Sequence, residues 1–242
     1  MVCNKNKLAF ITGASRGLGK NLALTMLENN WEVHGFARSE IKITHPCFTA
    51  KSKDLSRPDK LKEIFTETRK NLNDYKSIVL VNNAGTISPT GPLEQLKPEQ
   101  ISVLINLNLT TPLLLMGEFG RLTGNLKNIT RTIINISSGA GKHPYQGWVP
   151  YCTSKAGIDM ATEAFALEQG EEGIKIISFS PGVMDTKMQS QIRNLKPEIF
   201  PSKNRFLELK RQNLLSSPIK IAKYLLNKLE QQSFEQGAIT TY

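Results

Sequence analysis

The chain has 242 residues, of which 39% are hydrophobic, and a formal net charge of +10 at pH 7. This length can bury one large core, and no linker or low-complexity tract interrupts it, so we expect a single domain over residues 1–242. The lysines are dispersed, without a run of five or six cations or interleaved aromatic residues. This argues against a nucleic-acid partner and favours a solvated basic surface, which would also suit an anionic cofactor or substrate.

Targeting signals and metal-ligand patterns are not visible in the sequence. The first residues lack the apolar stretch of a signal peptide, and no run approaches the roughly 18 apolar residues that span a bilayer. The three cysteines, Cys3, Cys47 and Cys152, form an odd set without metal-ligand spacing, which suits a reducing compartment. We therefore expect a soluble, cytoplasmic protein with no membrane partner and no bound metal.

Short apolar runs alternate with longer segments of helical periodicity. The expected strands are 8–11, 32–36, 78–81, 132–136 and 174–179, with edge or late strands at 48–50 and 238–240. The expected helices include 18–29, 58–72 and 154–168. Near-continuous apolar strands separated by helices indicate a parallel sheet covered on both faces. The prediction is an α/β fold: a single Rossmann-type doubly wound domain, with a parallel sheet of about seven strands and helices on both faces.

The segment 183–209 is less regular than the rest of the chain. It follows a strand and mixes apolar residues such as Met184 and Met188 with polar residues and two prolines. A long, partly apolar excursion of this kind could be a lid over a substrate. An ordinary helical excursion is the alternative.

A glycine-rich stretch follows the first expected strand and opens the first expected helix. Its sequence is Thr12-Gly13-Ala14-Ser15-Arg16-Gly17-Leu18-Gly19. Glycines in this position let backbone amides approach a pyrophosphate at the positive end of a helix. The stretch therefore predicts a dinucleotide site, with contacts from Gly13, Ser15, Arg16, Gly17, Leu18 and Gly19.

Tyr151 and Lys155 are four residues apart, and Ser138 lies thirteen residues before the tyrosine. Side chains at i and i+4 share a helix face, and a nearby positive charge favours a phenolate, so Lys155 could tune Tyr151 toward the working pH. Such a pair also occurs by chance on solvated helices. The Tyr151–Lys155 pair is more informative here because the sequence also contains, in a fixed order, the glycine stretch, Asn82-Asn83-Ala84-Gly85 and Pro181-Gly182.

This set of motifs resembles the short-chain dehydrogenase/reductase family along nearly the whole chain. The resemblance implies that Tyr151 donates a proton to a carbonyl that Ser138 polarises. Lys155 would bond the nicotinamide ribose and lower the pKa of Tyr151. Asn108 looks like the family asparagine that supports a water-mediated proton relay, with Asn106 as the competing assignment.

The resemblance also assigns cofactor contacts outside the glycine stretch. Asp54 and Leu55 would lie near the adenine, and Thr186 would hold the nicotinamide carboxamide. The remaining implied contacts are the stretch Asn82-Asn83-Ala84-Gly85 beneath the adenine and ribose, and Pro181, Gly182 and Val183.

The end of the second strand selects the cofactor in this family, where an acidic residue would bond the ribose of NAD. Here the stretch 36–39 carries Arg38 and Ser39 and no carboxylate. Arg38 and Arg16 could both meet a 2′-phosphate, which guanidinium groups bind well. NADP(H) is therefore expected rather than NAD(H). Two solvated surface arginines are the alternative reading.

Two segments, 135–152 and 217–238, resemble the sepiapterin reductase and bacterial benzil reductase branches of the family, which reduce one carbonyl of a vicinal dicarbonyl. Tyr145 and Trp148 would supply flat walls for such a substrate, although aromatic packing under a loop is an alternative. The implied substrate residues are Ser138, Tyr145, Trp148, Tyr151, Met184 and Met188.

Thr241 falls where the sepiapterin reductases carry an aspartate that anchors the pterin. A neutral hydroxyl cannot pair with the pterin as a carboxylate would, so aromatic diketones are favoured over sepiapterin. Reduction of 3-oxoacyl thioesters is a further enzymatic alternative, and an NADPH-sensing scaffold is a non-enzymatic one. By resemblance we also expect a homodimer formed through the helices that carry Asn108 and the Tyr151–Lys155 motif.

Overall fold

The computed structural model describes residues 6–61, 64–65 and 72–242. Its centre is a single seven-stranded sheet in which every pairing is parallel. The strands are β1 (Lys7–Thr12), β2 (Glu32–Ala37), β3 (Phe48–Ser52), β4 (Ser77–Asn82), β5 (Thr130–Ile136), β6 (Lys175–Ser180) and β7 (Ile239–Thr241). Their order across the sheet is β3-β2-β1-β4-β5-β6-β7, so the predicted doubly wound fold is confirmed.

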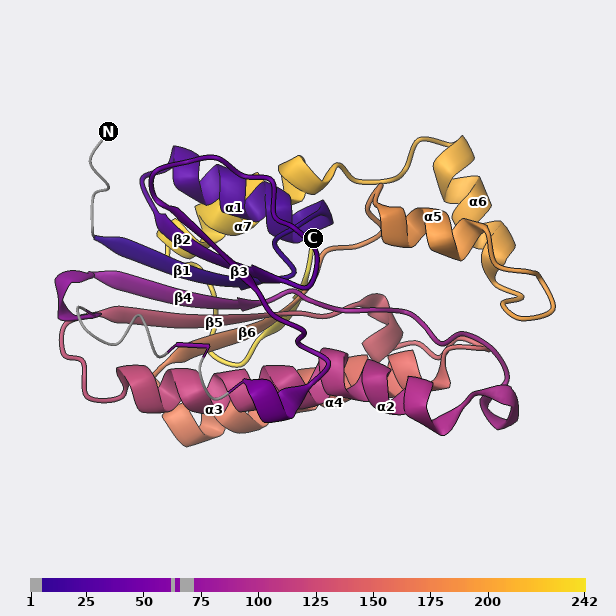
Figure 1. Cartoon of the computed structure of the whole chain (residues 1–242), viewed down its shortest axis with the longest axis horizontal. Coiled ribbons are helices and arrows are strands. Elements are labelled where there is room, and N and C mark those ends of the chain that lie inside the picture. Colours follow the sequence, from indigo (N-terminus) through magenta and orange to yellow (C-terminus); the bar gives the residue numbers. More distant parts are fainter. Residues whose placement is uncertain (1–5, 62–63, 66–71) are drawn as a thin grey trace.

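Helices cover both faces of the sheet (Figure 1). On one face lie α1 (Gly17–Glu28) and α7 (Pro218–Glu230), and on the other lie α3 (Thr111–Thr123) and α4 (Val149–Gln169). The remaining helical segments are η1 (Pro58–Lys60), η3 (Leu93–Gln95), α2 (Pro98–Ile105), η4 (Asn106–Thr110), η5 (Gly139–Gly141), α5 (Lys187–Arg193) and α6 (Lys203–Arg211). The helix predicted over 58–72 falls partly outside the described residues, and within them its start forms the short turn η1.

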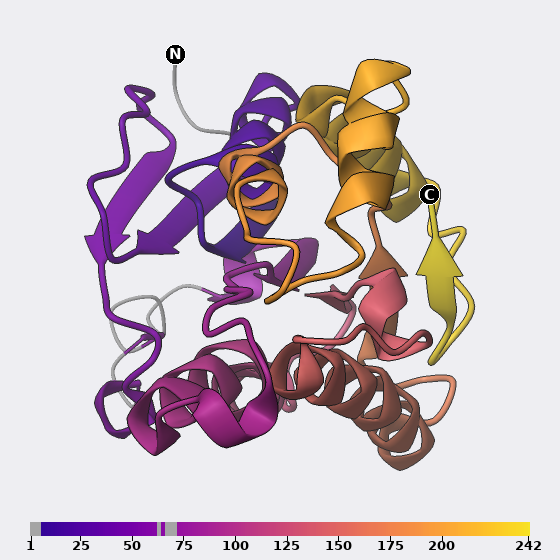
Figure 2. The ribbon, with the colours of Figure 1, turned by 90° about the vertical axis from the view of Figure 1, so that its right-hand side faces the viewer.

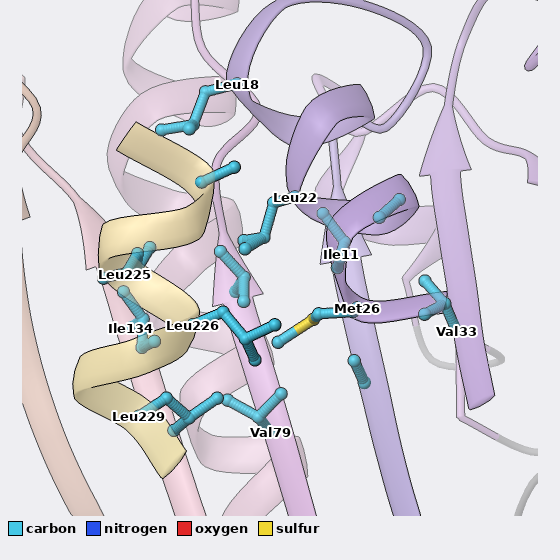
Figure 3. Close-up of a cluster of buried hydrophobic side chains, with 14 of the residues drawn as sticks. Ile11, Leu18, Leu22, Met26, Val33, Val79, Ile134, Leu225, Leu226 and Leu229 are labelled. Atoms are coloured by element: carbon cyan, nitrogen blue, oxygen red, sulfur yellow. The ribbon is translucent and has the colours of Figure 1, made fainter. Parts of the chain in front are cut away.

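Alternate residues of the central strands enter different cores. In β1, Ala9 and Ile11 face the core under α1 and α7, whereas Leu8 and Phe10 face the core on the other side. Figure 3 shows the first core, where Leu22 and Met26 of α1 approach the α7 leucines over the strand residues. Because both faces are covered, the strands are apolar at nearly every position, which explains the continuous runs in the sequence.

The helix that carries the Tyr151–Lys155 motif begins earlier than its periodicity indicated. It spans Val149–Gln169, with Pro150 in its first turn, whereas the prediction began at 154. Proline suits this position because the first helical N–H groups have no partner within the helix. The helix ends at Gly170, whose φ of 62° favours glycine. Tyr151 and Lys155 therefore share one helix.

The stretch Pro98–Thr123 has a mean hydropathy of 1.3 and is, by length and composition, the one described helix that could cross a membrane. It comprises α2, the π-helical segment η4 and α3. Leu104, Leu115 and Phe119 are fully or almost fully buried within the protein. Of the apolar window of this stretch, 33% is buried inside the protein.

The cysteines differ from the expectation of a reducing environment. Cys47 is disulfide-bonded, while Cys152 carries a free thiol and is half-buried. Within the described ranges, no group of three or more His, Cys, Asp or Glu side chains could hold a metal ion.

Candidate active site

One cleft of about 1210 Å³ lies at the carboxyl end of the sheet. Residues from the ends of β1, β2, β4, β5 and β6 line it, together with residues from α4 and from the segment that carries α5 and α6. Figure 2 shows α5 and α6 in front of this end of the sheet. Ligands of open parallel sheets bind where the strand order reverses, which here is between β1 and β4.

The glycine turn after β1 forms one wall of the cleft. Gly13 and Gly17 have φ values of 71° and 58°, which favour glycine, and both line the cleft. The first turn of α1 has neither a side-chain cap nor an acidic residue. Its free N–H groups and the positive helix end fit a phosphate-bearing cofactor. Ser15, Arg16 and Leu18 line the cleft beside them.

Gly19 has a packing role rather than a place in the cleft lining. A Cβ atom at this position would overlap the Asn83 side-chain nitrogen and the Gly13 carbonyl oxygen. The glycine therefore lets α1 approach the ends of β1 and β4 closely. This is the helix–strand packing role of the last glycine in dinucleotide-binding turns. The contact of Gly19 with a cofactor stays a prediction.

Asn82 was also expected at the cofactor, but it is buried away from the cleft. Its side-chain nitrogen donates to Asn135 Oδ1 over 2.8 Å, because the two residues lie opposite each other on β4 and β5. Asn83, Ala84 and Gly85 of the same stretch line the cleft. The side chains of adjacent strand residues point to opposite faces, so a shift of one position reverses their roles.

A hydrogen-bond network that the sequence reading missed fixes the Asn83 loop. Thr12 Oγ1 accepts from the backbone N–H groups of Asn83 and Ala84 over 2.9 and 3.0 Å. In return, Asn83 Nδ2 donates to the Thr12 carbonyl oxygen over 2.8 Å. These bonds join the ends of β1 and β4 at the edge of the cleft. Asn83 belongs to the stretch that the resemblance assigns to the cofactor, but nothing in the sequence marked its hydrogen bonds to Thr12.

Two arginines stand where cofactor selection was expected. Arg16 and Arg38 are exposed and both line the cleft. Ser39, also in the lining, donates to Ser15 Oγ over 2.9 Å. Glu40 is exposed and lies outside the lining. The described end of β2 therefore offers positive charge to a ligand in the cleft.

Asp54 and Leu55 line the cleft after β3. Asp54 Oδ1 accepts from the Ser56 hydroxyl over 2.7 Å and from the Ser56 backbone N–H over 3.1 Å. The Ser56 hydroxyl bond is the main cause that lowers the pKa of Asp54, and the charges of Arg38 and Arg57 act in the same direction. An ionised carboxylate at this position can accept a hydrogen bond from a base amine.

Ser138 and Tyr151 are neighbours in the cleft. The Ser138 side chain acts on the Tyr151 phenol as a hydrogen-bonding group. Tyr151 is 7% exposed, and both residues line the cleft. Burial raises the pKa of Tyr151, and the Ser138 hydrogen bond opposes this rise only in part. In the protein alone, the phenol is therefore held in its protonated form, which is the form that can donate a proton.

Lys155 lies on the same helix face, and its Nζ is 5.9 Å from the centroid of the Tyr151 ring. Nζ donates to the carbonyl oxygen of Ile136 over 2.8 Å. Burial lowers the pKa of Lys155 to about 8, against the opposing effect of the Asp159 charge. Lys155 was expected to bring the pKa of Tyr151 down. In the protein alone the net shift of Tyr151 is upward, because burial dominates.

Asn108 lies behind the cleft, in the π-helical segment η4 between α2 and α3. Its side chain donates to the Thr86 carbonyl oxygen over 2.8 Å and accepts from the Thr86 N–H over 2.9 Å. It also donates to Ser154 Oγ over 3.2 Å. Asn108 is 2% exposed, whereas Asn106 is half-buried. Single π-helical turns often mark functional sites, since they alter the backbone hydrogen bonding of a helix.

The loop after β6 brings Pro181, Gly182, Val183 and Thr186 into the cleft lining. Thr186 caps α5 by accepting from the Gln189 N–H over 3.4 Å. A Cβ atom on Gly17 would lie 3.7 Å from Thr186 Cγ2. The cap therefore places Thr186 across from the glycine turn.

Aromatic side chains build the other half of the cleft. The rings of Tyr145 and Tyr151 each lie 5.2 Å from the Trp148 ring. Phe200 stacks on Trp148 at 4.4 Å, and Phe206 lies 5.9 Å from it. Tyr145, Trp148 and Phe206 line the cleft, whereas Phe200 is fully buried behind them. The aromatic cluster therefore contains both side chains that line the cleft and a side chain that packs behind them.

The segment predicted as a lid forms two helices, α5 and α6, which lie in front of the carboxyl end of the sheet (Figure 2). Met184 and Met188 line the cleft from this segment, as expected. Arg205 also lines it, and donates from Nη1 to the Tyr145 hydroxyl over 2.8 Å. The sequence reading missed Arg205 because nothing local distinguishes it from other surface cations.

The C-terminal strand closes the far end of the cleft. Thr241 of β7 lines it. The position expected to replace a pterin-binding aspartate therefore does face the ligand space. At position 241 the cleft is therefore lined by the hydroxyl of Thr241 and not by a carboxylate.

A family model described as "short chain dehydrogenase" matches residues 7–196. The chain is 39% identical over 245 residues to a benzil reductase ((S)-benzoin forming) from Bacillus cereus, covering 96% of this chain and 98% of that protein. It is 29% identical over 248 residues to a sepiapterin reductase from Meriones unguiculatus, covering 94% and 93%.

Solved structures show the same architecture. The crystal structure of the KRED1-Pglu enzyme superposes with a TM-score of 0.84 at 26% identity, covering 97% of this chain and all of that chain. A 4-hydroxyisoleucine dehydrogenase complexed with NADH gives a TM-score of 0.81 at 23% identity, covering 98% and 96%. Because the 4-hydroxyisoleucine dehydrogenase is only 23% identical to this chain, its similarity supports the fold alone.

Proposed function

Because the chain belongs to the short-chain dehydrogenase family, we propose that it is an NADPH-dependent reductase that acts on one carbonyl of a vicinal dicarbonyl. One observation carries the proposal. The neighbouring Ser138 and Tyr151 line the cleft together with the glycine turn on one side and the aromatic side chains of Tyr145, Trp148 and Phe206 on the other. A carbonyl at this point would lie between a cofactor and an apolar binding surface.

The roles of Tyr151 and Ser138 follow from where negative charge develops during carbonyl reduction. Bound NADPH would supply a hydride to the carbonyl carbon, and negative charge would then develop on the carbonyl oxygen. A protonated Tyr151 can deliver the second hydrogen as a proton, and the Ser138 hydroxyl can stabilise the developing charge. The product is a hydroxyl group next to the carbonyl that did not react.

Lys155 and Asn108 complete the proposed set. A charged Lys155 would favour the phenolate that Tyr151 leaves after proton transfer, and it would bond the nicotinamide ribose. Asn108 is the better relay candidate than Asn106, because a Cβ atom on Gly85 would lie 3.4 Å from Asn108 Oδ1 and 3.9 Å from Lys155 Nζ. Both side chains therefore border the same glycine.

The proposed preference for NADP(H) rests on Arg16 and Arg38. Both line the cleft at the end where the adenosine would lie, and no acidic side chain from the end of β2 joins them there. Guanidinium groups bind phosphate with two parallel hydrogen bonds, so two of them favour a cofactor with a 2′-phosphate.

The proposed substrate class rests on the aromatic half of the cleft and on the relatives. Tyr145, Trp148 and Phe206 present flat apolar surface to an aryl group. The benzil reductase relatives share more of the sequence than the sepiapterin reductase relatives. Thr241 also offers no carboxylate for a pterin. Aromatic diketones are therefore preferred to sepiapterin.

We further propose that the chain forms a homodimer. Large apolar side chains are exposed on the helices that carry Asn108 and the Tyr151–Lys155 motif. They include Val103, Leu113, Leu114, Val149, Met160 and Leu167, and Leu167 is 87% exposed. Burial of such residues in a self-complementary contact would remove them from water.

Steady-state NADPH oxidation tests the reaction. The purified protein is given an aromatic 1,2-diketone, sepiapterin and an acetoacetyl thioester, with the Tyr151→Phe variant as a control for non-specific oxidation. We expect the highest kcat/KM for the diketone. A much higher value for sepiapterin or for the thioester would assign the protein to that substrate class instead. Binding of NADPH without turnover of any carbonyl would indicate a cofactor-sensing role.

A further inference from the structure

Asp159 is a buried carboxylate that the sequence did not mark as functional. It lies on the same face of α4 as Tyr151 and Lys155. Asp159 follows Lys155 by one helical turn and Tyr151 by two on α4. It is 5% exposed. A charged side chain is rarely buried to this extent without a compensating partner.

Asp159 contacts two elements next to the catalytic residues. Its Oδ1 accepts from the Ser178 hydroxyl of β6 over 2.5 Å. Its Oδ2 lies against Gly141 so closely that a Cβ atom on that glycine would be 2.5 Å away. Gly141 donates its N–H to the Ser138 carbonyl oxygen over 2.9 Å, within the turn η5 that Ser138 caps. The carboxylate therefore borders the turn that carries Ser138.

We propose that Asp159 is a positioning residue for the reaction, acting through Lys155 and through the turn that follows Ser138. The inference rests on the proposed function, since it concerns the same catalytic group. Asp159 does not line the cleft. It acts as the counter-charge behind the lysine.

The surroundings of Lys155 show why a counter-charge matters. On α4, its titratable neighbours are Tyr151 and Asp159. From β5 it receives only the uncharged Ile136 carbonyl, and Gly85 and Asn108 border it from the other side. Burial drives the lysine toward its neutral form, and the Asp159 charge is the described influence that opposes this change.

Removal of the Asp159 charge should therefore make Lys155 lose its proton at lower pH. For two charges one helical turn apart in a protein of intermediate dielectric constant, the expected shift of the Lys155 midpoint is about one pH unit. Proton donation by Tyr151 is assisted by a charged lysine, so the alkaline limb of kcat/KM for carbonyl reduction should move downward by the same amount.

The test compares Asp159→Asn, which keeps the shape of the side chain, with Ser178→Ala, which removes the hydrogen bond and keeps the charge. Asp159→Ser serves as a second uncharged variant in case the asparagine variant does not fold. The Lys155 midpoint is measured by NMR on protein carrying ¹³C-labelled lysine, with the signal assigned from a Lys155→Arg variant. The pH profile of kcat/KM is measured on the same proteins.

We expect both uncharged variants to lower the Lys155 midpoint and the alkaline limb together, while Ser178→Ala leaves both in place and lowers only the melting temperature. If the uncharged variants lost the same fraction of kcat/KM at every pH and the Lys155 midpoint did not move, Asp159 would have only a structural role and the proposal would be wrong. The NMR midpoint needs no substrate. A lowered midpoint in a protein that reduces no diketone would therefore retain this inference and reject the proposed function.

Discussion

Arg205 of α6 donates a hydrogen bond to the Tyr145 hydroxyl over 2.8 Å, and its guanidinium carbon lies 5.9 Å from the centroid of the same ring. The two residues are 60 positions apart in the sequence. They join the lid segment to the loop that supplies the aromatic wall. Nearby, a Cβ atom on Gly147 would overlap the Ile199 carbonyl oxygen of the lid segment. The 183–209 segment and the aromatic wall are therefore in close contact at two places.

Arg205→Met should weaken substrate binding, because it removes this link while leaving the reacting groups in place. For one partly exposed hydrogen bond to a charged donor, we expect KM for the diketone to rise about fivefold with little change in kcat. Steady-state kinetics checks this. Arg211→Met is the matched control, since Arg211 lies on the same helix, pairs with Glu208 and is not in the cleft lining. Equal effects of the two substitutions would argue against a role for the link.

Tyr151→Phe should abolish proton donation without removing the aromatic ring that packs on Trp148. A decrease in kcat of about 10²- to 10⁴-fold is expected for loss of a general acid. NADPH binding, followed by fluorescence, should stay within about twofold of the unmodified protein. Tyr224→Phe, outside the cleft lining, should leave kcat unchanged. Retained activity in Tyr151→Phe would exclude the proposed donor.

Arg38→Ser should reduce the affinity for NADPH and leave that for NADH almost unchanged, because only NADPH carries the 2′-phosphate. Loss of one charge-assisted hydrogen bond at an exposed site corresponds to about tenfold in Kd. Fluorescence titration with both cofactors measures the ratio. Arg121→Ser controls for the overall positive charge, since Arg121 is an exposed arginine outside the cleft lining. The same loss for both cofactors would contradict recognition of the 2′-phosphate.

The buried Lys155 should make stability depend on pH in a defined window. Burial lowers its pKa from 10.5 to about 8 in the folded protein, so between these values the unfolded chain binds more protons at this site. Stability contributed by this residue therefore rises with pH across the window. The free energy of unfolding, relative to Lys155→Met, should increase by about 2 kcal/mol from about pH 8 to about pH 10.

Urea denaturation of both proteins across the window measures this difference. The comparison stops near pH 10 because the raised pKa of Tyr151 acts in the opposite direction above that value. If the difference in the free energy of unfolding between the two proteins stayed constant with pH, Lys155 would not be held in a desolvated site.

Gly19→Ala should destabilise the fold through overpacking, because its Cβ atom would overlap Asn83 and the Gly13 carbonyl. Misfits of this kind cost about 1–3 kcal/mol. Gly139→Ala is the matched control, since a Cβ atom there meets nothing within 4 Å. Thermal denaturation of the two variants should therefore separate them, and equal melting temperatures would argue against close packing at Gly19.

The sequence by itself determined the features that depend on local spacing. Apolar periodicity gave the alternation of strands and helices, the glycine turn marked the start of α1, and the four-residue spacing placed Tyr151 and Lys155 on one helix face. Such patterns are readable because hydrogen bonding within a helix and alternation along a strand repeat over a few residues.

Only the tertiary structure decided which neighbours those residues meet. It placed Asn83 rather than Asn82 in the cleft, brought Phe200 and Phe206 of the lid segment onto Trp148, and set Asp159 between Ser178 and Gly141. It also reversed the expected direction for Tyr151, whose pKa burial raises. The reason is physical: burial, ring stacking and the pairing of distant side chains depend on how separate elements pack, and local spacing carries no record of that packing.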